Sequence, residues 1–276
     1  MASILSINSQ VAYGHVGAEA AAFALRRLGH EVSLIPTVQF SNHPGHSGYR
    51  GGPVPLSRAK NLLIGMLERD LLDNCAAIHS GYLGAGEMAE VIVHARDNLP
   101  ATLYCCDPVM GDSGQLYVGE DVADAIYQRL VPIADIVTPN AFELSLLTGM
   151  TIKYLEDALK ASRALLTAGP EIVVCTSAAM EVDRIATMVV TASEAWVAWT
   201  PRIDNPPHGT GDTFAALFLG RYLMTENVGN SLSLATASVQ GLINAGSGGP
   251  LKDIAIIQGQ HEISDPRIDV IIETLD

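Results

Sequence analysis

Strand-like and helical segments alternate along almost the whole chain, and this alternation is the strongest constraint on its fold. Short apolar runs typical of strands occupy residues 4–7, 31–38, 75–80, 101–106, 133–137 and 171–175. An antiparallel pair over 185–190 and 195–199 follows, and then two long helices over 213–224 and 232–245. Such alternation favours a mostly parallel sheet with helices on both faces. We therefore predict a single α/β domain over residues 1–276.

The charge balance restricts the possible ligands. The chain carries 30 acidic and 16 basic residues, for a formal net charge of −14. Nucleic acids and anionic membranes need Lys and Arg to neutralise their phosphates, so neither is expected as a partner. If the ligand is a polyphosphate, local N–H donors or divalent cations must hold it.

The apolar runs and the cysteines indicate where the protein works. No apolar run is long enough to span a bilayer, and the N-terminal residues lead into a strand without a basic region. The cysteines show no metal-type spacing and lie in strand-like surroundings, at Cys75, Cys105, Cys106 and Cys175. They are expected to be buried free thiols of a cytoplasmic protein.

Ligands of open parallel sheets bind beyond the carboxyl ends of the strands. The polar residues just after predicted strand ends are Ser9, Asp107, Asn140, Thr176 and Asp212. Residues 39–55 are rich in Gly, Pro, Ser and His and predict a long loop or a small flap. A second loop is predicted over residues 109–119.

The stretch Gly209-Thr210-Gly211-Asp212 precedes an apolar helix. Free N–H groups at a helix start bind anions well, and the helix dipole adds to this. Asp212 then has two interpretations. It is an N-terminal cap, or it is a base beside a phosphoryl group that is being transferred.

Two further stretches place carboxylates at strand ends. In the first, Asp107 and Asp112 flank a Pro-Val-Met-Gly turn, and in the second, Asn140 and Glu143 stand three residues apart. The second pair is also the pattern of a capping box. Together, Asp107, Asp112 and Glu143 would form an oxygen-rich site of the kind that Mg²⁺ shares with phosphates.

Other catalytic patterns are missing from the sequence. It contains no Walker-type phosphate loop, no dinucleotide fingerprint and no Gly-x-Ser-x-Gly elbow. His43 and His46 stand three apart, but the sequence indicates no third ligand, which disfavours a zinc site. His15 and His208 are expected to be surface or turn residues.

Seven motifs, in order from about residue 4 to 245, resemble the pyridoxal kinases of the ribokinase-like superfamily. They are Leu5-Ser6-Ile7-Asn8-Ser9, Gly14-His15-Val16-Gly17, the run from Thr37 to His43, Asp107 to Asp112, Thr138-Pro139-Asn140 with Glu143, Thr176-Ser177, and Gly209 to Asp212 with Phe214. The resemblance implies a ribokinase-like fold, a homodimer, and transfer of phosphate from ATP to the hydroxymethyl group of a B6 vitamer.

The resemblance also implies roles for individual residues. Asp212 would be the catalytic base, and Gly209, Thr210 and Gly211 would form an anion hole. The vitamer pocket would be lined by Ser9, Val16, Val38, Phe40, His43, Pro44, Gly45 and Tyr82, beside Asp212. Asp107 and Glu143 would hold Mg²⁺. ATP would contact Asp107, Asp112, Tyr117, Thr138, Asn140, Glu143, Thr176, Ser177, Gly209 and Gly211, and the segment Thr200, Pro201, Arg202 and Ile203 would flank the nucleotide.

One departure from the family pattern concerns the vitamer. Pro44 stands where the family commonly has Thr, which removes a hydroxyl and an N–H and leaves the preference among pyridoxal, pyridoxine and pyridoxamine open. Two rival functions remain. A hydroxymethylpyrimidine kinase of the same superfamily typically has Cys at the position of Asp212. A non-catalytic pyridoxal-phosphate binding protein could have kept the fold.

Overall fold

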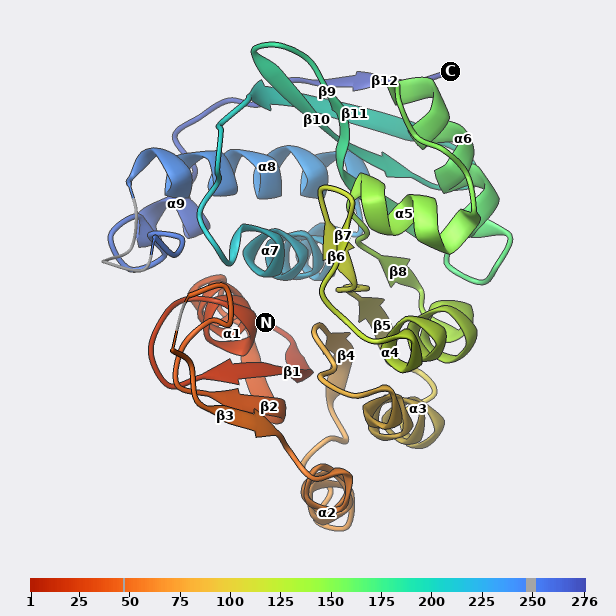
Figure 1. Ribbon diagram of the computed structural model, residues 1–276, viewed down its shortest axis with the longest axis vertical. Coiled ribbons are helices and arrows are strands. Elements are labelled where there is room, and N and C mark those ends of the chain that lie inside the picture. Colours follow the sequence, from red (N-terminus) through yellow and green to blue (C-terminus); the bar gives the residue numbers. More distant parts are fainter. Residues whose placement is uncertain (47, 247–251) are drawn as a thin grey trace.

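One large sheet runs through the molecule (Figure 1). The computed structural model describes residues 1–46, 48–246 and 252–276. In these residues the sheet has ten strands, in the order β12-β11-β10-β9-β8-β5-β4-β1-β2-β3. Its parallel centre consists of β1 (Ser3–Val11), β2 (Glu31–Phe40), β4 (Cys75–Ser80), β5 (Leu103–Cys106), β8 (Ile136–Val137) and β9 (Ile172–Met180).

Antiparallel strands extend both edges of this centre. On one side β3 (Gly51–Pro53) pairs with β2, and on the other lie β10 (Arg184–Val190), β11 (Ala195–Pro201) and β12 (Ile272–Thr274). A separate hairpin is formed by β6 (Gly111–Asp112) and β7 (Gln115–Leu116). The predicted pair of antiparallel strands around residues 191–194 is confirmed.

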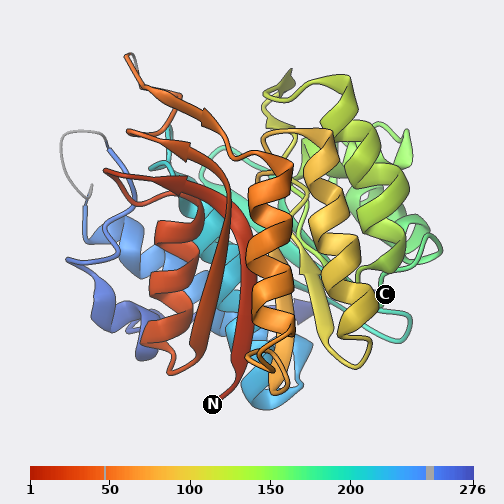
Figure 2. The ribbon, with the colours of Figure 1, turned by 90° about the horizontal axis from the view of Figure 1, so that it is seen from below.

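Helices cover both faces of the sheet, and each face has its own apolar core (Figures 1 and 2). One face carries α1 (Gly17–Arg27), α7 (Thr210–Thr225), α8 (Val228–Asn244) and α9 (Gln260–Ser264). The other carries α2 (Leu56–Leu67), α3 (Ala89–Asn98), α4 (Glu120–Ala125), α5 (Ala141–Thr148) and α6 (Leu155–Leu166). Short helical turns are η1 (Gly86–Met88), η2 (Ile126–Leu130) and η3 (Val131–Ile133). Among the described residues, none of the helices is long and apolar enough to cross a bilayer.

The helix that follows the Gly209 stretch is buried on all sides. Every residue of α7 from Thr213 to Arg221 is buried, because the helix lies between the sheet, α1 and α8. Phe214, Leu217 and Phe218 enter the core that it shares with α1. A helix without a polar face cannot roll or slide at low cost, so its N-terminus is held firmly at the carboxyl edge of the sheet.

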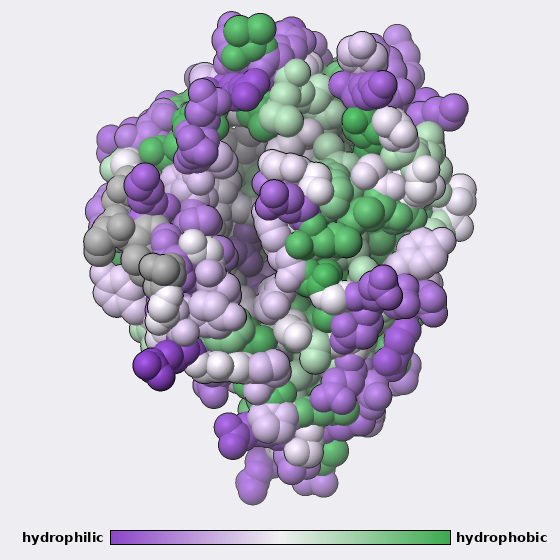
Figure 3. All heavy atoms as spheres, viewed as in Figure 1, coloured by the Kyte–Doolittle hydropathy of each residue, from purple (hydrophilic) through white to green (hydrophobic). Residues whose placement is uncertain are grey.

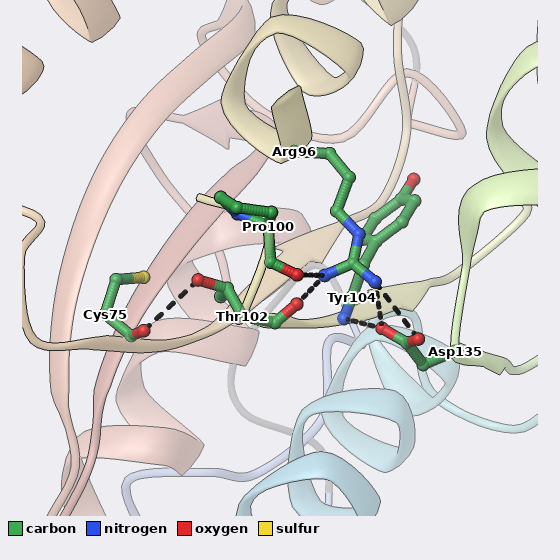
Figure 4. Close-up of polar contacts among 6 residues, drawn as sticks. All are labelled: Cys75, Arg96, Pro100, Thr102, Tyr104 and Asp135. Atoms are coloured by element: carbon green, nitrogen blue, oxygen red, sulfur yellow. Dashed lines mark hydrogen bonds and ion pairs between the residues drawn. The ribbon is translucent and has the colours of Figure 1, made fainter. Parts of the chain in front are cut away.

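At the amino edge, a polar contact ties α3 to the sheet (Figure 4). Arg96 Nη2 donates to both carboxylate oxygens of Asp135, at 3.1 and 3.0 Å, and Nη1 donates to the carbonyl of Thr102. Asp135 also accepts the N–H of Tyr104 at 2.6 Å. This contact joins α3, the start of β5 and the residue before β8, which fixes the parallel centre from the side opposite the ligand edge.

Two local expectations need correction, and a third is confirmed. The strand predicted to end at Cys175 continues through Thr176 and Ser177, because a register irregularity against β10 absorbs Ser177, whose φ is +52°. The predicted loop over 109–119 contains the β6–β7 hairpin. The loop predicted over 39–55 is confirmed as a small flap, in which the end of β2 pairs with β3.

Candidate active site

The parallel strands direct their carboxyl ends toward the viewer of Figure 1 and toward the top of Figure 2. Figure 3 shows that this face is hollowed near its middle, beside the β6–β7 hairpin. Three carboxylates come together at this edge. Asp107 follows β5, Glu143 lies in the first turn of α5 after β8, and Asp212 lies in the first turn of α7.

Asp107 is the most strongly perturbed of the three. It is 8% exposed, and burial raises its pKa well above the usual carboxyl range, with further contributions from the negative charges of Glu143 and Asp212. Its Oδ1 accepts the hydroxyl of Thr138 at 3.0 Å, which opposes the shift. Its Oδ2 accepts no hydrogen bond from the described residues. Asp107 therefore has one oxygen available for a cation.

Glu143 has a structural duty. Its N–H donates to Asn140 Oδ1 and its Oε2 accepts the Asn140 N–H, both at 2.9 Å, so the capping box is confirmed. Its Oε1 accepts the N–H groups of Met110 at 2.9 Å and Gly111 at 3.3 Å. Burial raises the Glu143 pKa to about 7 although these three N–H groups favour the carboxylate. Glu143 thus holds the loop after β5 against α5.

Two neighbours of this carboxylate differ from each other in role. Asn140 donates from Nδ2 to the Gly111 carbonyl at 2.8 Å, so its side chain is fully used within the fold. Asp112 is exposed on β6, and its Oδ1 accepts the Ser113 N–H at 2.6 Å. It lies near enough to Glu143 to raise that pKa, but it stays outside the buried group of carboxylates.

The start of α7 leaves backbone donors open. Gly209 is the N-cap residue with φ +84°, a conformation that favours glycine, and a Cβ there would lie 2.1 Å from the His15 carbonyl oxygen. The N–H groups of Thr210, Gly211 and Asp212 donate to none of the described backbone oxygens, and no side chain caps them. Thr210 uses its hydroxyl on the Pro207 carbonyl, at 2.6 Å. A helix start of this kind is an anion site.

Asp212 is the third helical residue rather than the N-cap, and the interpretation of Asp212 as a cap is wrong. Burial raises its pKa, while the Gly17 N–H and the Asn8 side chain oppose the shift by favouring the carboxylate. Asn8 is fully buried in β1, and its Nδ2 favours the Asp212 carboxylate without reaching hydrogen-bond geometry with any described residue. Sequence reasoning missed Asn8 as a site residue, although a polar side chain inside an apolar strand was a usable signal.

The residues expected to line the vitamer pocket come from β1, the residue before α1, β2, the flap and the loop after β4. Val16 and Val38 are buried, and Phe40 packs edge-on against Tyr49, with ring centroids 5.2 Å apart. Burial and the nearby Tyr49 raise the pKa of Tyr82.

The other expected pocket residues differ in exposure. Ser9 lies against Gly17, where a Cβ would come within 2.2 Å of the Ser9 hydroxyl. Pro44 and Gly45 are exposed on the flap. The ring of His43 lies 4.5 Å from that of His208, directly before the anion site.

The expected nucleotide residues are more scattered. Tyr117 follows the β6–β7 hairpin and is 59% exposed. Partial burial and the negative charges of Asp112 and Glu143 raise its pKa. Thr176 and Ser177 lie in the irregular part of β9. Thr200 and Pro201 pair with β10 inside β11 rather than forming a loop, and only Arg202 and Ile203 leave the strand.

Comparisons with known proteins agree with this geometry. Residues 61–252 match the family model described as phosphomethylpyrimidine kinase. The chain is 42% identical to the pyridoxal kinase PdxY of Deinococcus radiodurans, over 96% of this chain and 94% of that protein. It is 40% identical to the pyridoxal kinase PdxY of Rubrobacter xylanophilus, over 96% and 95%.

Solved structures give the same answer. The chain superposes on pyridoxal kinase from Leishmania donovani, solved with ADP and ginkgotoxin, with a TM-score of 0.92, 28% identity and full coverage of both chains. The same enzyme with ADP and pyridoxamine matches equally well. The predicted ribokinase-like α/β fold is therefore confirmed, and the chain belongs to the pyridoxal kinase family.

Proposed function

We propose that this chain transfers the γ-phosphoryl group of ATP to the 5-hydroxymethyl group of pyridoxal, giving pyridoxal 5'-phosphate and ADP. The observation that carries the proposal is the start of α7, where Asp212 stands in the same turn as three open N–H groups. A base and an anion site in one turn are the two parts that phosphoryl transfer to an alcohol requires. Pyridoxine and pyridoxamine are further candidate substrates.

The proposed transfer accounts for every bond that forms or breaks and for the proton that is released. The vitamer hydroxyl oxygen forms a bond to the γ-phosphorus while the bond from phosphorus to the β–γ bridging oxygen breaks and ADP leaves. Asp212 accepts the hydroxyl proton. The N–H groups of Thr210, Gly211 and Asp212 stabilise the charge on the transferred group, a contribution of about 3 kcal/mol for one well-placed donor.

Mg²⁺ fits the acidic edge of the sheet. Asp107 has an oxygen without a hydrogen-bond donor and is repelled by Glu143 and Asp212, so a divalent cation would relieve an unfavourable charge group. Asp107 suits a direct contact better than Glu143, whose oxygens already accept three N–H groups. Bound Mg²⁺ would neutralise phosphate charge beside Asp107, whose neighbours Glu143 and Asp212 are also acidic.

The remaining assignments follow the family pattern. ATP contacts are proposed for Tyr117, Thr138, Thr176, Ser177, Arg202 and Ile203, with Asp112, Asn140, Thr200 and Pro201 in supporting positions. Vitamer contacts are proposed for Ser9, Val16, Val38, Phe40, His43, Pro44, Gly45 and Tyr82. The support is that these residues border the carboxyl edge on which the carboxylates and the anion site lie.

The test measures ADP formation with each B6 vitamer and with hydroxymethylpyrimidine, with and without Mg²⁺. We expect metal-dependent turnover with pyridoxal, and a fall of kcat by at least about 100-fold in Asp212→Asn, the usual scale for loss of a general base. Because burial raises the Asp212 pKa, kcat/KM should decline with falling pH sooner than an exposed aspartate would dictate, and Asp212→Asn should lack this acid limb.

The exposed Asp124→Asn on α4 is the matched control and should retain full activity. Unchanged turnover in Asp212→Asn would disprove the base assignment. No ADP with any vitamer would disprove the proposed substrate. Preferential turnover of hydroxymethylpyrimidine would favour the second candidate function, which the description of the matching family model supports.

We further propose a homodimer that works in the cytoplasm. Support for the dimer comes from apolar side chains on α2 and in the turn after it, where Leu62 is 44%, Ile64 38% and Leu71 61% exposed. Support for the compartment comes from the cysteines, all of which are free thiols.

A further inference from the structure

Three histidines from two distant parts of the sequence meet beside the anion site. His43 and His46 lie in the flap, and His208 directly precedes Gly209. One ring nitrogen from each lies within 4.8 Å of the others. The ring centroid of His208 lies 4.5 Å from that of His43 and 4.9 Å from that of His46. The third partner that the sequence did not indicate is therefore His208, and its assignment to the surface or a turn was incomplete.

A buried carboxylate completes the cluster. Asp253 is 2% exposed, and its Oδ1 lies 3.5 Å from Nε2 of His46. Neither atom has a hydrogen-bond partner within the described residues, although both are buried. The other oxygen, Oδ2, accepts the His15 N–H at 2.9 Å, which fixes the carboxylate. Buried polar atoms without partners are costly, so a small shift that closes the 3.5 Å gap between these two atoms would stabilise both.

The three imidazole side chains indicate which kind of ligand the cluster would bind. We propose that His43, His46 and His208 bind one zinc-class transition-metal ion, and that Asp253 orients the imidazole of His46. Three neutral imidazoles are the ligand set that Zn²⁺ accepts, whereas Mg²⁺ requires oxygen ligands. A carboxylate on the ring nitrogen that does not bind the ion is the usual support of such histidines. This site is separate from the acidic edge proposed for Mg²⁺, but it shares His43 with the proposed vitamer pocket, so the ion and the vitamer would compete for that side chain.

The surroundings of His43 and His208 favour their neutral forms. Burial first, and then the neighbouring rings of His208 and His46, lower the pKa of His43 to about 4, against the attraction of Asp253. Burial and His46 also lower the pKa of His208. Both shifts favour the neutral imidazole, which is the form that binds a metal ion.

Closing around an ion requires a small movement. With bonds of about 2.0–2.1 Å, nitrogens of a tetrahedral site lie about 3.4 Å apart, so the nitrogens must approach by at most about 1.4 Å. The cost is the contact between the Gly45 N–H and His43 Nδ1, which at 3.2 Å is long for a hydrogen bond. Rotations within the exposed 44–45 turn can supply this movement.

The experiment titrates ZnCl₂ into chelator-treated full-length protein, without nucleotide or vitamer, against a chromophoric chelator. We expect one ion per chain. His46→Gln and His208→Gln should each weaken binding at least about 100-fold, and Asp253→Asn about 10- to 100-fold. Excess Mg²⁺ should not displace the ion. Co²⁺ in place of Zn²⁺ should give the intense visible absorption of a tetrahedral site.

The matched control is His94→Gln, which removes an exposed histidine of α3 and should bind Zn²⁺ as the unchanged protein does. The thermal midpoint of each metal-free variant shows whether it is folded. If either His46→Gln or His208→Gln fails to fold, the other still tests the site. Absence of stoichiometric binding, or binding retained in both ligand variants, would overturn the proposal. Since the titration involves no turnover, its failure is independent of the kinase assay.

Discussion

At the scale of single residues, the interior of the sheet holds a titratable group that the chemistry does not use. His79 on β4 is fully buried, its Nδ1 lies 3.3 Å from the Ser6 hydroxyl, and its Nε2 has no partner among the described residues. Burial lowers the His79 pKa from 6.5 to about 4. The folded protein therefore resists taking up a proton that the unfolded chain accepts.

This shift predicts how stability depends on pH. The contribution of His79 is fully present above pH 6.5 and is lost as pH falls from 6.5 toward 4, by at most about 1.4 kcal/mol per pH unit. Urea unfolding of His79→Gln should therefore show a flatter decline of the free energy of unfolding across this window. The exposed His94→Gln should keep the original slope. Parallel curves for the original protein and His79→Gln would contradict the assignment.

At the scale of elements, the start of α7 depends on a backbone that only glycine adopts easily. Gly209→Ala would place a Cβ 2.1 Å from the His15 carbonyl oxygen at φ +84°. We expect the free energy of unfolding to fall by about 1–3 kcal/mol, together with a loss of kcat as the N–H groups shift.

The matched control for this prediction is two residues away. Gly211→Ala meets no atom within 4 Å and has no positive φ, so it should not lower stability. Equilibrium urea unfolding of both variants provides the comparison. Equal destabilisation of the two would show that strain at Gly209 is not the cause.

The polar contact of Arg96 with Asp135 and Thr102, which ties α3 to the sheet, gives a second prediction at this scale. Arg96→Lys keeps the charge but cannot make the paired contacts to Asp135 together with the Thr102 carbonyl. Because the pair is partly exposed, we expect a loss of only about 1–2 kcal/mol in the free energy of unfolding. Arg163→Lys on the exposed side of α6 is the control. An equal loss of unfolding free energy in this variant would contradict a stabilising role of the Arg96 contact.

At the scale of the whole molecule, the ten-stranded sheet joins β1 near the N-terminus to β12 near the C-terminus, and a single domain over residues 1–276 stays a prediction. The same view isolates α2 as an outlying helix (Figure 1). Its exposed leucine and isoleucine are the surface on which the proposed dimer depends.

Light scattering after size exclusion checks this proposal. The unchanged protein should have the mass of two chains, and Leu62→Asp should shift it toward one, because a charge on an apolar interface costs several kcal/mol. Val182 lies in the β9–β10 turn and is 96% exposed, so Val182→Asp should keep the mass of two chains. A monomer at micromolar concentration would contradict the dimer.

Much of the site could be predicted because its residues follow strand ends. Asp107, Glu143 and Asp212 are local in the sequence to recognisable strand–turn–helix patterns, and parallel strands bring their carboxyl ends to one edge. Asp212 was harder, because capping and catalysis use the same residue types at a helix start. Only the left-handed Gly209 and the absence of a side-chain cap separate the two.

The sequence by itself determined the α/β alternation, the polar strand ends and the capping box of Asn140 and Glu143, since each depends on residues a few positions apart. The tertiary structure alone decided which distant groups meet. His208 joins His43 and His46 across more than half the chain, and Asp253 reaches His15 from near the C-terminus. Neither contact leaves a local pattern, because each joins segments far apart in the sequence, and an isolated backbone bridge between His208 and Asp253 holds the two groups together.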